Sequence, residues 1–151
     1  FPIRPTDNET LLMEFNTSHR NLKEDWIEWM RKSSLELLKQ NPYPVLYGCN
    51  SVAELYPPIA KELYNIAFVS CWSILNDKQK ETMVKYLNMA IQHPTIPISI
   101  LQTILNLAEF MQHDREVIPI DISVLGDLAE RCLAYAKALY YREIEFEVSR
   151  L

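Results

Sequence analysis

The chain has 151 residues, a hydrophobic fraction of 48% and a formal net charge of −5 at pH 7. This length is enough for one domain with a sizeable core, or for roughly three to four helical repeats. The sequence holds two glycines, and tight β-hairpins usually recruit glycine, so the composition predicts an all-α protein. The acidic balance, with no helix that carries a stripe of Lys and Arg, argues against a surface for nucleic acid.

Helical periodicity and capping residues predict about six to seven helices in chain order. The box Thr-Asp-Asn-Glu at 6–9 predicts a short helix capped by Thr6 and Glu9. Asn21 with Glu24 predicts the start of the next helix, and the prolines of the chain separate the later ones. Asn76-Asp77 and Asp121 predict the N-caps of two later helices. The predicted helices cover residues 6–15, 21–38, 44–56, 58–75, 77–92, 97–113 and 121 onwards.

The segment 58–75, PIAKELYNIAFVSCWSIL, is apolar nearly all round, which is typical of a buried helix with neighbours on several sides. Trp72 lies in this segment, whereas Trp29 lies at the edge of its apolar stripe, beside Glu28 and Arg31. We therefore expect Trp72→Ala to destabilise the fold more than Trp29→Ala. The residues expected in the structural core are Trp26, Leu63, Phe68, Trp72, Leu107, Phe110, Leu128 and Ala136.

Consecutive helices are expected to pair as 21–38 with 44–56, 58–75 with 77–92, and 97–113 with the last helix. The pairs begin about 36 to 39 residues apart, a spacing within the range of two-helix repeats. We therefore predict an α-solenoid of antiparallel helix pairs, similar to HEAT or TPR repeats. A compact helical bundle is the structural alternative, because periodicity does not set the order of stacking.

No catalytic, cofactor-binding or metal-binding residues are predicted. Gly48 and Gly126 are isolated within predicted helices, where they cannot form a phosphate-binding loop, and Gly48 is expected where a neighbouring helix approaches closely. His19, His93 and His113 lack a second ligand at helical spacing, and His113 beside Asp114 is interpreted as a helix C-terminus. Glu143, Glu145 and Glu147 are expected on a solvated face, and Cys49, Cys71 and Cys132 as reduced core thiols of a cytosolic protein.

Four ordered segments resemble the central region of the target of rapamycin kinases, which are large phosphatidylinositol-3-kinase-related protein kinases. These are DWIEWMRKSSLELL at 25–38, LYNIAFVSCWSILN at 63–76, TILNLAEFMQHD at 103–114 and LGDLAERCLAYAKALYYREIEF at 125–146. The chain departs from the family at Ile74, where an acid is usual, at Gln112, where Glu is usual, and at Tyr140, where His is usual.

The resemblance implies a segment at the junction of the HEAT solenoid and the FAT domain of a cytoplasmic Ser/Thr kinase of growth signalling. Residues 1–20 would be a short helix or flexible lead-in, 21–120 helical repeats, and 121–151 a long helix that opens the TPR-like FAT repeats. ATP and magnesium would bind a kinase domain far downstream. Implied partners are Raptor-type or Rictor-type subunits, a β-propeller subunit and a Rheb-type GTPase, in part at lysosomal or vacuolar surfaces.

The sequence leaves two functions open. The first is a non-catalytic scaffold segment of such a kinase, and the second is a free-standing helical-repeat adaptor that binds a peptide. We expect the chain, which opens with Phe1 and not Met, to be a segment of a longer protein. A longer reading frame with a kinase domain would favour the first function.

Overall fold

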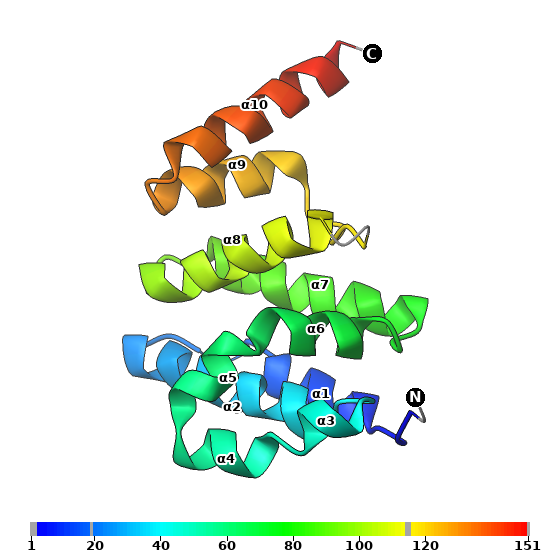
Figure 1. The fold of residues 1–151 in the computed structure, drawn as a ribbon. Helices are drawn as coiled ribbons and strands as arrows, with labels where there is room; N and C mark the ends of the chain where they lie inside the picture. Colours follow the sequence, from blue (N-terminus) through cyan, green and yellow to red (C-terminus); the bar gives the residue numbers. More distant parts are fainter. Residues whose placement is uncertain (1–2, 19, 114–115, 151) are drawn as a thin grey trace.

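A computed structural model describes residues 3–18, 20–113 and 116–150 of the chain, and within these ranges all regular structure is helical. The helices stack into an elongated array, with α3 and α4 at the base, α6 to α8 in the middle and α9 and α10 at the C-terminal end (Figure 1). This architecture confirms the predicted all-α solenoid. The helices are α1 (Asn8–Phe15), α2 (Lys23–Lys39), α3 (Pro44–Tyr47), α4 (Asn50–Leu55), α5 (Pro57–Glu62), α6 (Tyr64–Trp72), α7 (Asp77–Gln92), α8 (Ile98–His113), α9 (Ile122–Arg131) and α10 (Tyr135–Ser149).

The capping residues at the starts of α1 and α2 differ from those predicted. The N-cap of α1 is Asp7, whose carboxylate accepts hydrogen bonds from the amide and hydroxyl of Thr10. At the start of α2, the Asp25 carboxylate accepts hydrogen bonds from the backbone N–H groups of Asn21 and Leu22. The capping side chain therefore belongs to the first turn of the helix itself. A carboxylate is a stronger acceptor than the Thr or Asn oxygen expected there.

The starts of α7 and α9 are capped as predicted. Asn76 Oδ1 accepts from the Gln79 amide, and Gln79 Oε1 accepts in return from the Asn76 N–H, so the two residues form a reciprocal capping box. Asp121 Oδ1 accepts from the Ser123 N–H at the start of α9. Local sequence signals therefore place the beginnings of these two helices correctly.

Three predicted helices are each broken into two, which is why the chain has more helices than predicted. The segment 44–56 turns at Gly48 and Cys49, and the nearest atoms to a Cβ built on Gly48 are carbonyl oxygens of the preceding turn, so no neighbouring helix explains this glycine. The segment 58–75 changes direction at Leu63, whose backbone stays in the right-handed region. The last predicted helix ends at Cys132 and restarts at Tyr135.

The turn between α9 and α10 is a Schellman motif without glycine. Leu133 has a positive φ of 57°, its N–H donates to the Glu130 carbonyl, and the Ala134 N–H donates to the Ala129 carbonyl. This left-handed position is usually occupied by Gly, because a Cβ atom there is unfavourable by roughly 1–2 kcal/mol. The sequence offers no glycine at this point, so the break could not be read from it.

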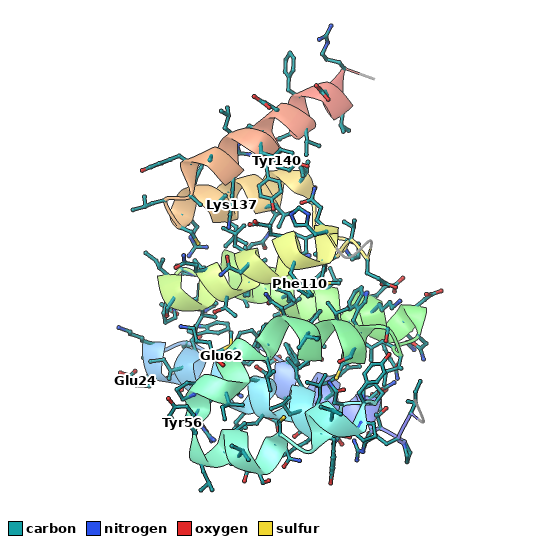
Figure 2. The ribbon with its side chains drawn as sticks, in the orientation of Figure 1. Glu24, Tyr56, Glu62, Phe110, Lys137 and Tyr140 are labelled. Atoms are coloured by element: carbon teal, nitrogen blue, oxygen red, sulfur yellow. The ribbon has the colours of Figure 1, made fainter. Side chains whose placement is uncertain are left out.

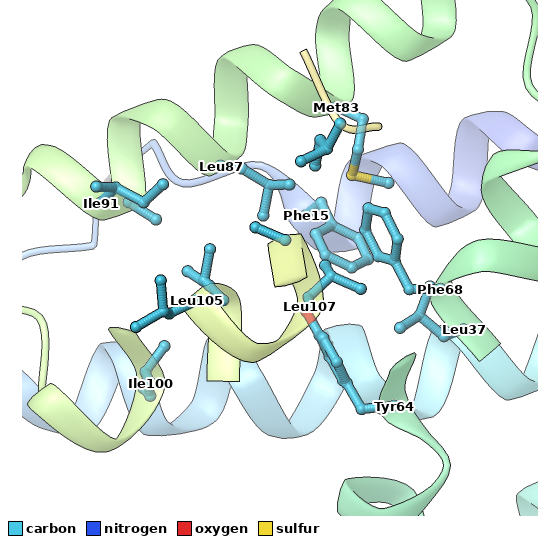
Figure 3. Packing of buried hydrophobic residues seen from close by; sticks show 14 of the residues in the cluster. Phe15, Leu37, Tyr64, Phe68, Met83, Leu87, Ile91, Ile100, Leu105 and Leu107 are labelled. Carbon is cyan, nitrogen blue, oxygen red and sulfur yellow. The ribbon is translucent and has the colours of Figure 1, made fainter. Parts of the chain in front are cut away.

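The main core lies where α1, α2, α6, α7 and α8 meet. Phe15, Phe68, Met83 and Leu107 converge from α1, α6, α7 and α8 in this core (Figure 3). The Trp29 ring is fully buried and meets Phe15 edge-to-face at 6.0 Å, while its Nε1 donates to the Phe15 carbonyl. The interpretation of Trp29 as an edge residue is therefore wrong, because α1 covers the side that its own helix leaves open.

Helix packing follows the predicted pairing only in part. Helix α2 packs against α3 and α4, and α8 packs against α9, as expected. The predicted pair of 58–75 with 77–92 is not the main contact of either segment, because α6 packs against α2 and α8 while α7 packs against α1 and α8. Helix α9 pairs most closely with α10 because the Schellman turn folds the last predicted helix back on itself.

No helix of the described ranges is both long enough and apolar enough to cross a bilayer.

Candidate interaction surfaces

The titratable groups with shifted pKa values have structural roles, either in the core or at helix ends. Burial raises the pKa of the Cys71 thiol to about 12 and also raises the pKa of the Tyr64 phenol. Hydrogen bonds from Thr10 lower the pKa of Asp7, and those from Leu22 and Asn21 lower the pKa of Asp25. Within residues 3–18, 20–113 and 116–150, no group of three His, Cys, Asp or Glu side chains is arranged to hold a metal ion. His19 and Asp114 lie outside the described residues.

Most of the residues expected in the core are buried in the structure. Trp26, Phe68, Trp72, Leu107 and Leu128 are buried, and Leu63 is half-buried. Two expectations are wrong: Phe110 is 37% exposed, and Ala136 is exposed. Both side chains therefore lie at the surface of the part of the chain that the structure describes.

One exposed apolar surface lies on α10. Tyr135, Leu139 and Phe146 recur at helical spacing, and each is more than half exposed. A neighbouring side of α10, with the buried residues Ala138 and Tyr141, packs within the molecule, where α10 contacts α9. A helix with apolar residues on two faces is suited to lie between two neighbours. The outer face of α10 is therefore a candidate contact for a further helical element.

Polar contacts tie α10 to α8 beside this surface, where Phe110, Lys137 and Tyr140 lie on one side of the molecule (Figure 2). Lys137 Nζ lies 2.5 Å from a Glu109 carboxylate oxygen, and Gln112 Nε2 donates to the Tyr140 hydroxyl over 2.8 Å.

Arg142 holds α10 against α9. Its guanidinium lies over Gly126, and a Cβ built on that glycine would lie 2.9 Å from Arg142 Cζ, so a side chain there would displace the arginine. Three carboxylates, of Asp127, Glu130 and Glu145, surround the guanidinium at 2.5–3.2 Å. The hydrogen bonds that its guanidinium donates to these carboxylates, above all to Asp127, raise the pKa of Arg142. Glu145 thus belongs to an ion cluster, while Glu143 and Glu147 are exposed as expected.

A second candidate surface is a groove of about 810 Å³ along the outer face of α7. Trp72 and Pro119 form one wall, and α7 from Asp77 to Gln92 forms the other. The Trp72 indole is held in place by a hydrogen bond from Nε1 to the Glu116 carboxylate, at 3.0 Å. Lys80 Nζ lies 5.4 Å from the centre of the Trp72 ring. The groove therefore combines an apolar wall with cationic and amide side chains.

Sequence reasoning missed the polar residues that tie distant segments together. Asn41 is fully buried, where Nδ2 donates to the Leu37 carbonyl and the Ser70 hydroxyl, and Oδ1 accepts from the Tyr43 N–H. Its position in Asn-Pro-Tyr-Pro indicated only a helix break. The Trp72 to Glu116 contact spans 44 residues, and no local pattern encodes it. The one signal in the sequence that could have indicated such a contact is the position of Asn41 next to a helix end.

Comparisons with known proteins show what the chain is similar to. No family model matches the chain. It is 53% identical over 133 residues to a protein of Arabidopsis thaliana named serine/threonine-protein kinase TOR, an alignment that covers 88% of this chain. The chain is homologous to one segment of the TOR serine/threonine-protein kinases. It is also 42% identical over 142 residues to serine/threonine-protein kinase TOR2 of Saccharomyces cerevisiae, and 40% identical over 164 residues to serine/threonine-protein kinase mTor of Drosophila melanogaster.

The chain is short beside these TOR relatives. The alignments cover 88% to 96% of this chain but only 5% to 7% of the length of the three relatives. The similarity therefore concerns one helical segment of a TOR-type protein.

Proposed function

We propose that this chain is a non-catalytic scaffold segment of a TOR-type serine/threonine protein kinase. In this role its helices connect neighbouring parts of a much longer protein and help to keep in position a kinase domain that lies elsewhere. The observation that carries the proposal is the similarity to TOR kinases over nearly the whole chain. In this stack of helices, titratable groups with shifted pKa values cap a helix or lie in the core. The apolar outer face of α10 supports it, because such a face suits a segment with a further neighbour.

The finer assignment follows the resemblance. Residues 21–120 would form the end of a HEAT solenoid and the start of a FAT domain, and residues 121–151 would open TPR-like repeats. Helix α1 packs against α2 and α7, which supports placing residues 8–15 in the same packed unit as the helices that follow. The whole protein would act in cytoplasmic growth signalling with Raptor-type or Rictor-type subunits, a β-propeller subunit and a Rheb-type GTPase, in part at endomembranes. ATP and magnesium would bind outside this segment.

The experiment has two arms. In the first, the purified chain is incubated with ATP, magnesium and a protein substrate, and we expect no phosphate transfer because this segment positions no nucleotide. In the second, the matched segment of yeast TOR2 is replaced by this chain or by a flexible Gly/Ser linker of equal length. We expect the chimera to phosphorylate its substrate at a rate within about threefold of the parent, and the linker version to lose most activity.

Phosphate transfer by the isolated chain, surviving a control with a mock purification, would contradict the non-catalytic assignment. Equal activity of the linker version and the chimera would contradict the scaffold role.

A further inference from the structure

The contacts between helices divide the molecule into two groups. Helices α1, α2, α6, α7 and α8 form a closed network, in which each helix contacts at least two of the others. Helix α9 contacts α8 and α10, and α10 packs mainly on α9. Among the described residues, the main bridge between the network and the α9–α10 hairpin is thus the contact of α8 with α9, at one end of the stack (Figure 1). In a stack whose stability depends on contacts between neighbours, such a boundary can open by itself.

The α9–α10 hairpin, residues 121–149, buries little apolar surface. Helix α8 buries seven of its 16 residues, whereas α10 buries two of its 15, Ala138 and Tyr141. Helix α9 contributes the apolar side chains of Leu125, Leu128 and Ala129. Segments with few buried apolar contacts open more readily than the core of the same protein. Helices of 10 and 15 residues are marginal in water on their own, so the hairpin should unfold when it leaves α8.

The two helices of the hairpin are joined to each other more firmly than to the network. The Arg142 guanidinium of α10 pairs with the Asp127 and Glu130 carboxylates of α9, and it also donates to the Ser123 carbonyl. The Schellman turn at Leu133 connects the two helix ends directly. Neither helix can leave without breaking these contacts, so α9 and α10 should open together.

The connector before α9 belongs to the network and not to the hairpin. The Glu116 carboxylate accepts a hydrogen bond from Trp72 of α6, and the side chains of Ile118 and Ile120 are buried. The next residue, Asp121, caps α9 by accepting from the Ser123 N–H. The boundary between the two groups therefore lies between residues 120 and 121.

Two cationic side chains of the hairpin reach across this boundary at the surface. Arg131 of α9 is exposed, and its guanidinium donates to the Ile91 and His93 carbonyls at the end of α7. Lys137 of α10 pairs with Glu109 of α8, and both side chains are more than a third exposed. Exposed contacts of this kind contribute little to stability, so they hold the hairpin without making its opening as unfavourable as unfolding of the core.

We propose that residues 121–149 form a separate cooperative unit, which opens from α8 and unfolds while the network of α1, α2, α6, α7 and α8 stays folded. The α8–α9 boundary is then the point at which this end of the stack detaches. Closure depends on the packing of α9 on α8 and on the contacts of Arg131 and Lys137.

Hydrogen–deuterium exchange of the native 151-residue chain, measured by mass spectrometry of its proteolytic fragments, reports the opening of each helix. Corrected for their intrinsic rates, the slowest amides of α9 and of α10 should exchange at the same rate. That rate should be at least about tenfold faster than the rate of the slowest amides of α2, α6 and α8. The last turn of α10 is left out of the comparison, because the ends of helices fray.

The variants test which contacts close the unit. Arg131→Gln and Lys137→Gln should each speed exchange in both α9 and α10 about threefold, and the double variant about tenfold, with no change in α2, α6 or α8. Lys39→Gln is the matched control, because it removes an exposed ion pair with Glu54 that lies away from the hairpin. It should leave exchange in α9 and α10 unchanged.

Three results would overturn the proposal. If α9 is as protected as α8 while α10 alone exchanges faster, the last helix frays and the hairpin is not a unit. A single rate for the slowest amides of every helix would mean that the chain opens only as a whole. Exchange in α9 and α10 that does not respond to the double variant, or that rises equally in α2, α6 and α8, would contradict closure by Arg131 and Lys137.

Discussion

Trp29 should be more important for stability than Trp72, the reverse of the order expected from sequence. Trp29 is 0% exposed, meets Trp26 edge-to-face at 5.5 Å and donates to the Phe15 carbonyl in the core. Trp29→Ala removes a large ring, at about 3–5 kcal/mol, and leaves a buried carbonyl without its donor, at about 1–3 kcal/mol. We expect a total loss of about 5 kcal/mol or more.

Trp72→Ala should destabilise the fold by about 3 kcal/mol. The Trp72 ring is 3% exposed and stacks on Phe68 at 6.0 Å, but its hydrogen-bond partner is the exposed Glu116, whose carboxylate can return to water when the indole is removed. The second penalty that applies to Trp29 is thus absent. With a urea m-value of about 2 kcal/mol/M, the two unfolding midpoints should differ by about 1 M.

The assay is urea unfolding followed by far-UV circular dichroism, whose signal does not depend on the tryptophans that are removed. If Trp29→Ala is too unstable to fold, Trp29→Phe and Trp72→Phe give the same comparison, since each keeps most of the ring volume and loses the N–H donor. A larger loss for either Trp72 variant than for its Trp29 counterpart would refute the reasoning from burial and hydrogen bonding.

Three further predictions concern local features. Leu133→Gly should raise the melting temperature by about 2–4 °C, because it relieves a left-handed Leu that is 68% exposed, and a lower melting temperature would contradict the Schellman assignment. Cys71, whose pKa burial raises to about 12, should resist a thiol reagent at pH 8 until urea unfolds the chain, and equal reaction rates in folded and unfolded chain would refute its burial. The pKa of Asp25 is lower in the folded chain than in the unfolded one, so its contribution to stability is present above the unfolded pKa and is lost as pH falls through the folded pKa. Asp25→Asn should therefore weaken the fall in melting temperature with acid, and an unchanged acid profile would contradict the capping role.

The helical content could be predicted because its signals are local. The capping pairs at Asn76 and Asp121 and the apolar periodicity of α7 and α8 depend on residues within one or two turns of each other. Such signals are readable in one sequence, and they also indicated the solenoid through the spacing of helix pairs.

The errors arose where distant segments decide the outcome. Trp29 is buried because Phe15 of α1, 14 residues earlier, packs over it, and Phe110 remains 37% exposed although it follows the apolar stripe of α8. The break at Leu133 uses a backbone conformation that usually requires glycine, so no residue type at this point indicated it. The α7 groove depends on Glu116 and Pro119 meeting Trp72, a contact set by the path of the chain after α8.

The central claim is that this segment supports a TOR-type kinase by being folded, without taking part in the chemistry. The most direct measurement is the substrate phosphorylation rate of the yeast TOR2 chimera as temperature rises, with the inserted segment carrying Trp29→Ala or the exposed control Lys61→Ala. We predict that the Trp29→Ala chimera loses activity at a temperature several degrees lower than the parent chimera, while Lys61→Ala follows the parent. Equal thermal profiles for the parent and Trp29→Ala chimeras, with the segment shown to be unfolded by limited proteolysis, would contradict the scaffold role.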